Sequence, residues 1–187
     1  MSASKATQKL VIIAVTNNLH PLELGSNTRV DTLLPDMTPE RLRGLFSINM
    51  PASEAFGAAL MPTIGLPRHV TVNGEATPLD AITTGVGVTP TIAFAAPSFG
   101  KADVHHVRAV QLDDLKDAAG NVVSARYVLS MATTKTSVAV PTGVLQASLH
   151  YNFEVTAVAA PGYDLAKPYV AQARDARART YTGLVAP

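Results

Sequence analysis

The chain has 187 residues, of which 47% are hydrophobic and 16% charged, so its composition is that of a globular protein rather than a disordered one. Fifteen lysines and arginines against fourteen acidic residues leave a net charge of +1, which creates no field that would recruit a polyanion, and we expect no nucleic-acid partner. The absence of cysteine excludes disulfides, thiolate metal sites and cysteine nucleophiles.

The first regular element is predicted over residues 10–16, which begin with a continuous apolar run from Leu10 to Val15. This run is too short for the apolar core of a signal peptide and for a membrane span, which needs about 20 residues. We therefore predict a strand covered on both faces, and no membrane span. Residues 28–34 are a second candidate strand.

The clearest helix signal begins at Thr38. Thr38 is a suitable N-cap, and Pro39 suits the first helical position. The apolar residues that follow fall on one helical face: Leu42, Leu45 and Phe46. We predict a short helix here and a second helical turn over residues 53–60.

Residues 69–73 alternate between polar and apolar side chains, which predicts a strand, and Asn73-Gly74 supplies a tight turn after it. The next segment, residues 78–87, is punctuated by threonine, glycine and proline. We divide the chain there into two domains. Residues 1–80 are expected to form a β-rich region with one or two short helices, and residues 81–187 a second domain.

From residue 88 onward, short β-type segments recur at regular spacing between turn residues, as in an all-β sandwich. The strands that we expect are residues 91–95, 104–112, 122–129, 137–140, 150–158 and 177–184. The fold class predicted for the whole chain is therefore mostly β.

Two motifs in this second half resemble those of fibronectin type III domains. Phe94 precedes Pro97 by three residues, with phenylalanine where the family usually has tryptophan. Leu145 precedes Tyr151 by six residues, and Tyr151 opens a Tyr-x-Phe-x-Val-x-Ala strand. The resemblance implies an immunoglobulin-like β-sandwich for residues 81–187. It also implies a non-catalytic role as a spacer, an adhesion module or a ligand-binding unit.

The side-chain alternation of residues 151–157 agrees with that resemblance. Tyr151, Phe153, Val155 and Ala157 share one face of a strand, which can enter a core, and the polar residues between them are expected to meet water. A buried Tyr151 hydroxyl would need an upstream backbone partner, as in the tyrosine corner of such sandwiches.

The candidate metal ligands do not form a convincing set. His105 and His106 are neighbours on a predicted strand, so they point to opposite faces and cannot share one metal ion without a bulge. A group of oxygen-bearing side chains is better explained as a solvated hairpin turn, with a calcium site as the alternative: Asp113, Asp114, Asp117 and Asn121. We predict no metal and no cofactor.

The candidate ligand-binding residues lie near the C-terminus. Residues 159–172 form a long connection with two tyrosines, and long loops on a rigid sandwich often carry binding residues. The segment after it, read as an edge strand, places Arg177 and Arg179 on one face. Protection of a sheet edge is the interpretation that we favour for these charges, and the alternative is an acidic partner or an anionic sugar. The candidates are Tyr163, Tyr169, Arg174, Arg177 and Arg179.

The sequence contains no G-x-S-x-G nucleophile motif and no glycine-rich nucleotide fingerprint. Our leading hypothesis is a non-catalytic binding or structural module of a larger extracellular or surface protein, with a protein or glycan as its partner. One alternative is an accessory, carbohydrate-associated domain of a secreted hydrolase. A third is a small metal-dependent enzyme in the N-terminal half. Ligand identity and oligomeric state stay open at this point.

Overall fold

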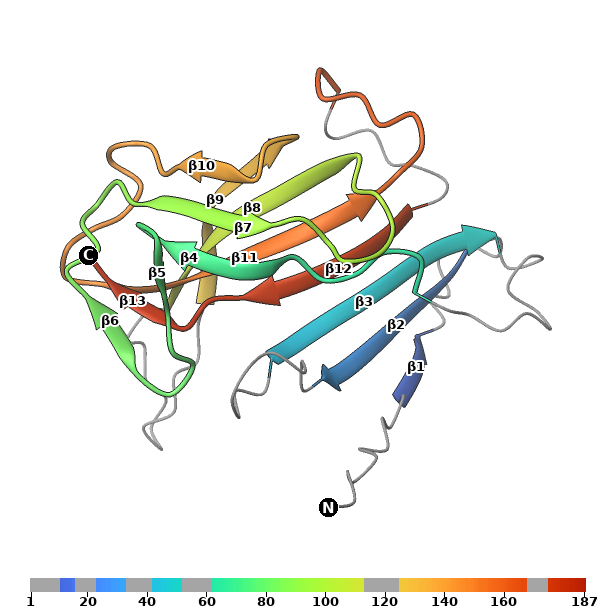
Figure 1. The fold of residues 1–187 in the computed structure, drawn as a ribbon, viewed down its shortest axis with the longest axis horizontal. Coiled ribbons are helices and arrows are strands. Elements are labelled where there is room, and N and C mark those ends of the chain that lie inside the picture. The colour runs from blue at the N-terminus through green and yellow to red at the C-terminus, as the bar shows by residue number, and fades with distance from the viewer. Residues whose placement is uncertain (1–10, 16–22, 33–41, 52–61, 113–124, 168–174) are drawn as a thin grey trace, which may run out of the picture.

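The computed structural model describes residues 11–15, 23–32, 42–51, 62–112, 125–167 and 175–187, which contain β-strands and no helix (Figure 1). The strands form two sheets. The predicted mostly-β fold class is confirmed for this part of the chain.

The larger sheet has nine strands and is centred on β11 (His150–Ala159). On one side, β11 pairs along its length with β8 (Val104–Leu112), which pairs with β9 (Ala125–Thr133). On its other side lie β12 (Asp175–Tyr181) and β13 (Leu184–Ala186). The remaining strands extend the sheet beyond these two: β3 (Leu42–Pro51), β2 (Glu23–Thr32) and β1 (Val11–Val15) beyond β12, and β6 (Ile82–Thr84) beyond β13.

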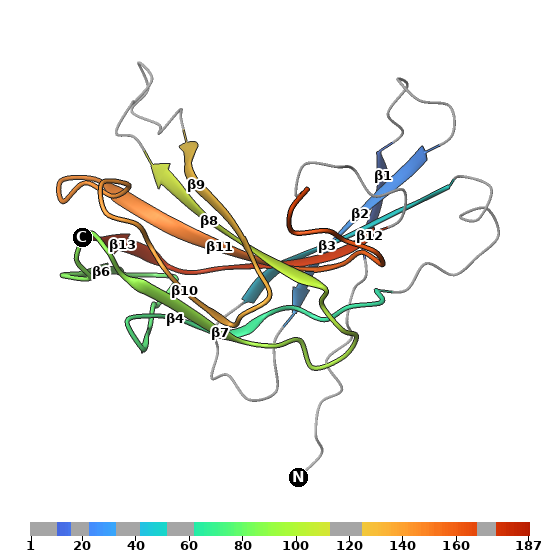
Figure 2. The same ribbon diagram turned by 90° about the horizontal axis from the view of Figure 1, so that it is seen from above.

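The smaller sheet has four strands in the order β10 (Ser137–Ala139), β7 (Thr91–Ala95), β4 (Arg68–Val72) and β5 (Glu75–Ala76). It lies on one face of the large sheet, and the β8–β9 pair and the β1–β2 pair rise on the opposite side (Figure 2). The main core is buried between the sheets and combines Ile92 and Phe94 of β7 with Phe153 and Val155 of β11. We call the face of the large sheet that is turned away from the small sheet the outer face.

The Tyr151 hydroxyl has the upstream partner that the sequence predicted. The backbone N–H of Gln146 donates to Tyr151 Oη at 2.9 Å, and the Tyr151 side chain is fully buried in the core. Leu145 is buried beside it, at 4% exposure. This hydrogen bond fixes the approach of the chain to β11.

The helix predicted from Thr38 is wrong over its second half, because residues 42–51 form the strand β3. This strand pairs with β2 along ten residues and with β12 over Asp175–Arg179. Phe46 and Ile48, two residues apart, pack against the same buried cluster, so the apolar spacing follows the period of a strand. Sheet pairing on both sides overrides the local helix signals. Residues 38–41 and the predicted helical turn at 53–60 lie outside the described residues.

Most predicted strands are confirmed with small shifts of their ends. Residues 91–95 and 104–112 have the predicted bounds. The strand predicted over 177–184 is divided into β12 and β13, and residues 122–129 correspond to β9 at 125–133. After β4, Asn73 and Gly74 both adopt positive φ, at 54° and 85°, as the predicted turn requires.

Strands from both sides of residue 80 contribute to each sheet. In the large sheet β3 pairs with β12, and in the small sheet β4 pairs with β7. The division into domains 1–80 and 81–187 stays a prediction, which separate expression of the two pieces would test.

Candidate functional site

The outer face of the large sheet carries a cluster of charged side chains on β8, β11 and β12. Glu154 of β11 lies opposite Arg108 of β8 on one side and Tyr181 of β12 on the other. Two residues further along β11, Thr156 lies opposite His106 of β8 and Arg179 of β12. Residues that pair across strands share a face, so the register alone gathers these groups.

Glu154 is the centre of this cluster, and only 1% of its side chain is exposed. Arg108 Nη1 lies 3.3 Å from Glu154 Oε1, and Arg179 Nε lies 3.1 Å from the same oxygen. The Arg179 contact is an ion pair without the alignment of a hydrogen bond. Tyr127 of β9 donates its hydroxyl to Glu154 Oε2 at 3.3 Å. A buried carboxylate requires such partners, because unpaired it would cost several kcal/mol.

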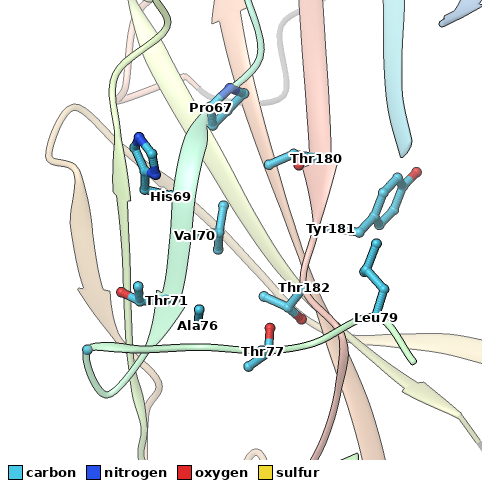
Figure 3. Close-up of a pocket in the computed structure, with 11 residues that line it drawn as sticks. Pro67, His69, Val70, Thr71, Ala76, Thr77, Leu79, Thr180, Tyr181 and Thr182 are labelled. Atoms are coloured by element: carbon cyan, nitrogen blue, oxygen red, sulfur yellow. The ribbon is translucent and has the colours of Figure 1, made fainter. Parts of the chain in front are cut away.

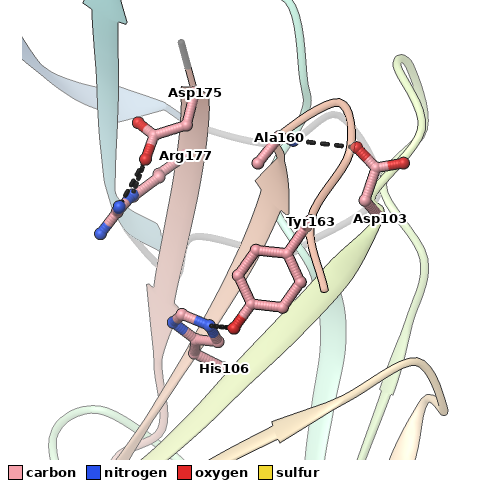
Figure 4. Close-up of polar contacts among 6 residues, drawn as sticks. All are labelled: Asp103, His106, Ala160, Tyr163, Asp175 and Arg177. Atoms are coloured by element: carbon pink, nitrogen blue, oxygen red, sulfur yellow. Dashed lines mark hydrogen bonds and ion pairs between the residues drawn. The ribbon is translucent and has the colours of Figure 1, made fainter. Parts of the chain in front are cut away.

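A second ion pair lies further along β12. Arg177 donates from Nε to Asp175 Oδ2 at 2.9 Å and also contacts this oxygen through Nη2 (Figure 4). The two residues are two positions apart on a strand, so they lie on the same face. The Asp175 side chain is 2% exposed, whereas that of Arg177 is 38% exposed.

The acidic and basic members of these ion pairs differ in their exposure to solvent. The side chains of Arg108, Arg177 and Arg179 are 28%, 38% and 22% exposed, whereas Glu154 and Asp175 are covered. A molecule that approaches this part of the outer face therefore meets guanidinium groups. The carboxylates lie beneath them and fix their orientation.

Tyr163 belongs to the loop that follows β11, and this loop folds back over the outer face. The Tyr163 hydroxyl lies 3.3 Å from His106 Nε2 (Figure 4). Tyr163 also packs on a small buried cluster of Val104, Val158 and Ala160. Asp103 Oδ2 accepts a hydrogen bond from the Ala160 backbone N–H at 2.9 Å and holds the start of the loop.

His106 lies among the arginines, and its pKa is lowered to about 4. Burial is the main cause, followed by the positive charges of Arg108 and Arg177, which outweigh the opposing effect of Asp175. The imidazole is therefore neutral at pH 7, and the electrostatic potential around it is positive.

His105 points to the other face, as the sequence predicted for neighbours on a strand. It is 5% exposed in the core, its ring centroid lies 4.9 Å from that of Phe94, and burial lowers its pKa. Neither ring nitrogen has a hydrogen-bond partner. In the described part of the chain, no three His, Asp or Glu side chains come together in a way that could hold a metal ion.

A separate pocket of about 240 Å³ lies between the β4–β5 hairpin and the end of β12 (Figure 3). His69 lines it with a positive φ of 50°, at a β-bulge in β4. The Thr77 and Thr182 hydroxyls that line the pocket are engaged with backbone groups, Thr77 with Gly183 N–H and Thr182 with Phe153 N–H. The pocket is therefore an apolar hollow, and its lining residues include no carboxylate, lysine or arginine.

The structure brings together three of the five predicted ligand-binding residues: Tyr163, Arg177 and Arg179 lie on the outer face. The interpretation of the arginines as edge protection is wrong, because β3 pairs with β12 over Asp175–Arg179 and makes β12 an interior strand there. Tyr169 and Arg174 lie outside the described residues. So do the calcium candidates Asp113, Asp114, Asp117 and Asn121.

Sequence reasoning missed the partners on the neighbouring strands, Arg108, His106 and Tyr127. It also placed Glu154 and Thr156 in water, whereas they are 1% and 3% exposed. A signal existed in the sequence: His106 and Arg108 alternate on one predicted strand, and Glu154 and Thr156 alternate on another. Pairing those strands would have brought opposite charges onto one face.

No protein-family model, curated protein or solved structure matches this chain. Over the residues that the structure describes, there is also no helix of the length and apolar character needed to cross a membrane.

Proposed function

We propose that this chain is a non-catalytic binding module of a larger extracellular or surface protein, and that its ligand, a protein or a glycan, binds the outer face. In this proposal the strands of the second half form a fibronectin type III-like sandwich. The pairing of β7 with β10, the pairing of β11 with β8 and β12, and the Tyr151–Gln146 hydrogen bond support that fold.

The observation that carries the proposal is the difference in solvent exposure between the arginines and the carboxylates of the outer face. Arg108, Arg177 and Arg179 are partly exposed, and each is held by a carboxylate that solvent barely reaches. Guanidinium groups fixed in this way lose little conformational entropy when a ligand binds, which is the advantage of a preorganised site. This face is better suited to ligand recognition than to proton transfer, because the carboxylates of Glu154 and Asp175 are already paired with arginines.

The proposal is tested by binding to a panel of acidic peptides, folded proteins and soluble glycans, compared between the native chain and Arg177→Glu. Arg126→Glu is the matched control, since Arg126 lies on β9 and its Nε and Nη2 bond Gln111 Oε1 at 3.3 and 3.1 Å. We expect the native ligand to lose affinity at least about tenfold in Arg177→Glu and to keep it in Arg126→Glu. A ligand held equally by both variants, or turnover of a panel member, would contradict the proposal.

A further inference from the structure

We propose that the outer face binds an extended acidic peptide whose carboxylates stand at alternate positions, one against Arg177 and the next against Arg179. This inference rests on the function proposed above and names the partner of the same site.

The spacing of the two arginines is the first argument. Arg177 and Arg179 are two residues apart on β12, so their Cα atoms are about 6–7 Å apart along the strand. An extended peptide presents every second side chain to the same side with the same period. A pair of acidic residues at positions i and i+2 therefore matches the two arginines, whereas a pair at adjacent positions directs one of its two carboxylates away from them.

The donors available on Arg177 are the second argument. Asp175 engages Nε and Nη2 of Arg177, and this leaves the Nη1 donors for a ligand. A guanidinium fork recognises a carboxylate oxygen with a strong, charge-assisted hydrogen bond. Arg108 lies two strands from β12, about 10 Å away. Arg108 therefore acts on the peptide at a distance, through its positive electrostatic potential. It also acts through Glu154, the carboxylate that pairs with both Arg108 and Arg179.

The tyrosines of the outer face favour a peptide over a sugar. A bound sugar usually stacks on an exposed aromatic ring. Tyr127 is 57% exposed, but the Arg108 guanidinium already lies over its ring, 5.1 Å from the centroid, and occupies a position where a sugar would stack. Tyr163 packs against the cluster of Val104, Val158 and Ala160. An anionic glycan is therefore an outcome of the test that would overturn this inference.

His106 provides a built-in reporter of the bound charge. Burial is the main cause of its lowered pKa, and the charges of Arg108 and Arg177 lower it further, so a carboxylate that binds at Arg177 offsets the charge effect and shifts the pKa upward. The imidazole signals can be followed by NMR against pH in the unmodified full chain. This readout needs no substitution that could disturb the fold.

The experiment titrates the full chain with a short threonine peptide that carries only two glutamates, one at position i and one at i+2, which is called the alternating peptide. One control, the contiguous peptide, has the same two glutamates at adjacent positions, and the other has glutamine in place of both glutamates. We expect the alternating peptide to bind most tightly and to raise the His106 pKa. We expect Arg177→Gln to weaken binding about tenfold, Arg177→Lys to weaken it less, and Arg126→Gln to leave it unchanged.

Equal affinity for the alternating and contiguous peptides, or an unchanged His106 pKa at saturation, would overturn the inference. If an anionic glycan or a folded protein binds in an Arg177-dependent manner and the alternating peptide does not, this inference fails and the proposed function stands. If the best ligand binds Arg177→Gln as well as the native chain, both fail.

Discussion

The two faces of β11 are both buried, but different interactions stabilise them. On the core face, Tyr151, Phe153 and Val155 pack against the small sheet, and Ala157 packs in a second apolar cluster with Ala176 and Ala178 of β12. On the outer face, Glu154 is buried by arginines from β8 and β12, whose own charges reach solvent. Alternation of apolar and polar residues therefore does not identify a water-facing side, because a polar residue can be covered by the side chains that pair with it.

The largest effect is expected on the core face, from Phe153→Ala. Phe153 is 0% exposed in the main cluster, so its truncation removes packing and leaves a cavity. The free energy of unfolding should fall by about 3–5 kcal/mol, measured by urea denaturation. The partly exposed Val88→Ala is the control and should change it by less than about 0.5 kcal/mol. Equal losses at the two positions would show that β11 does not form the core.

The matching test on the outer face removes the cations around Glu154. Arg108→Met combined with Arg179→Met leaves a buried carboxylate without its ion-pair partners, which should cost about 3 kcal/mol. Addition of Glu154→Met should restore most of that loss, because no buried charge then remains. If the triple variant is no more stable than the double variant, the ion pairs do not account for the burial of Glu154.

A smaller effect is expected where the core face begins, at Tyr151→Phe. This change removes the oxygen that accepts the Gln146 backbone N–H and leaves the ring in place. The unpaired donor should lower the free energy of unfolding by about 1–2 kcal/mol. A loss as large as that of Phe153→Ala would mean that the phenylalanine ring is no longer accommodated in the core.

The effect that develops most gradually is a dependence of stability on pH that involves both faces. The pKa of His105, in the core, and that of His106, on the outer face, are both lowered from 6.5, the latter to about 4. Below pH 6.5 the unfolded chain therefore binds protons that the native chain does not, and the free energy of unfolding falls as pH decreases toward 4. Well above pH 6.5 both histidines are neutral in both states and contribute no slope.

Urea denaturation across this pH range measures the effect, and His105→Leu with His106→Asn should flatten the slope. A slope that persists unchanged in the double variant would assign the pH dependence to other groups.

Local patterns predicted the strands of the second half well, because turn residues separate them and their alternation is regular. The prediction failed at residues 42–51, where Thr38 and Pro39 favour a helix but pairing with β2 and β12 decides the structure. For the outer face, the sequence correctly predicted that Arg177 and Arg179 lie on the same face of a strand. The role predicted for them, protection of a sheet edge, was wrong. Arg177 pairs with Asp175 on its own strand, whereas Arg179 pairs with Glu154 of β11, and only the register between strands distant in sequence reveals this second partner.

The pairing of β3 with β12 has a consequence for how the chain folds. Residues 42–51 pair with a strand that ends at residue 181, so the large sheet cannot be completed until the chain up to that residue has left the ribosome. Until then the edge of β3 that β12 will occupy has open backbone hydrogen-bonding groups. Contacts between segments so distant in sequence slow folding, because a long loop must close before they form. Among the described strands, β3 thus waits longest for a partner, and until β12 arrives its open edge is exposed to mispairing with another chain.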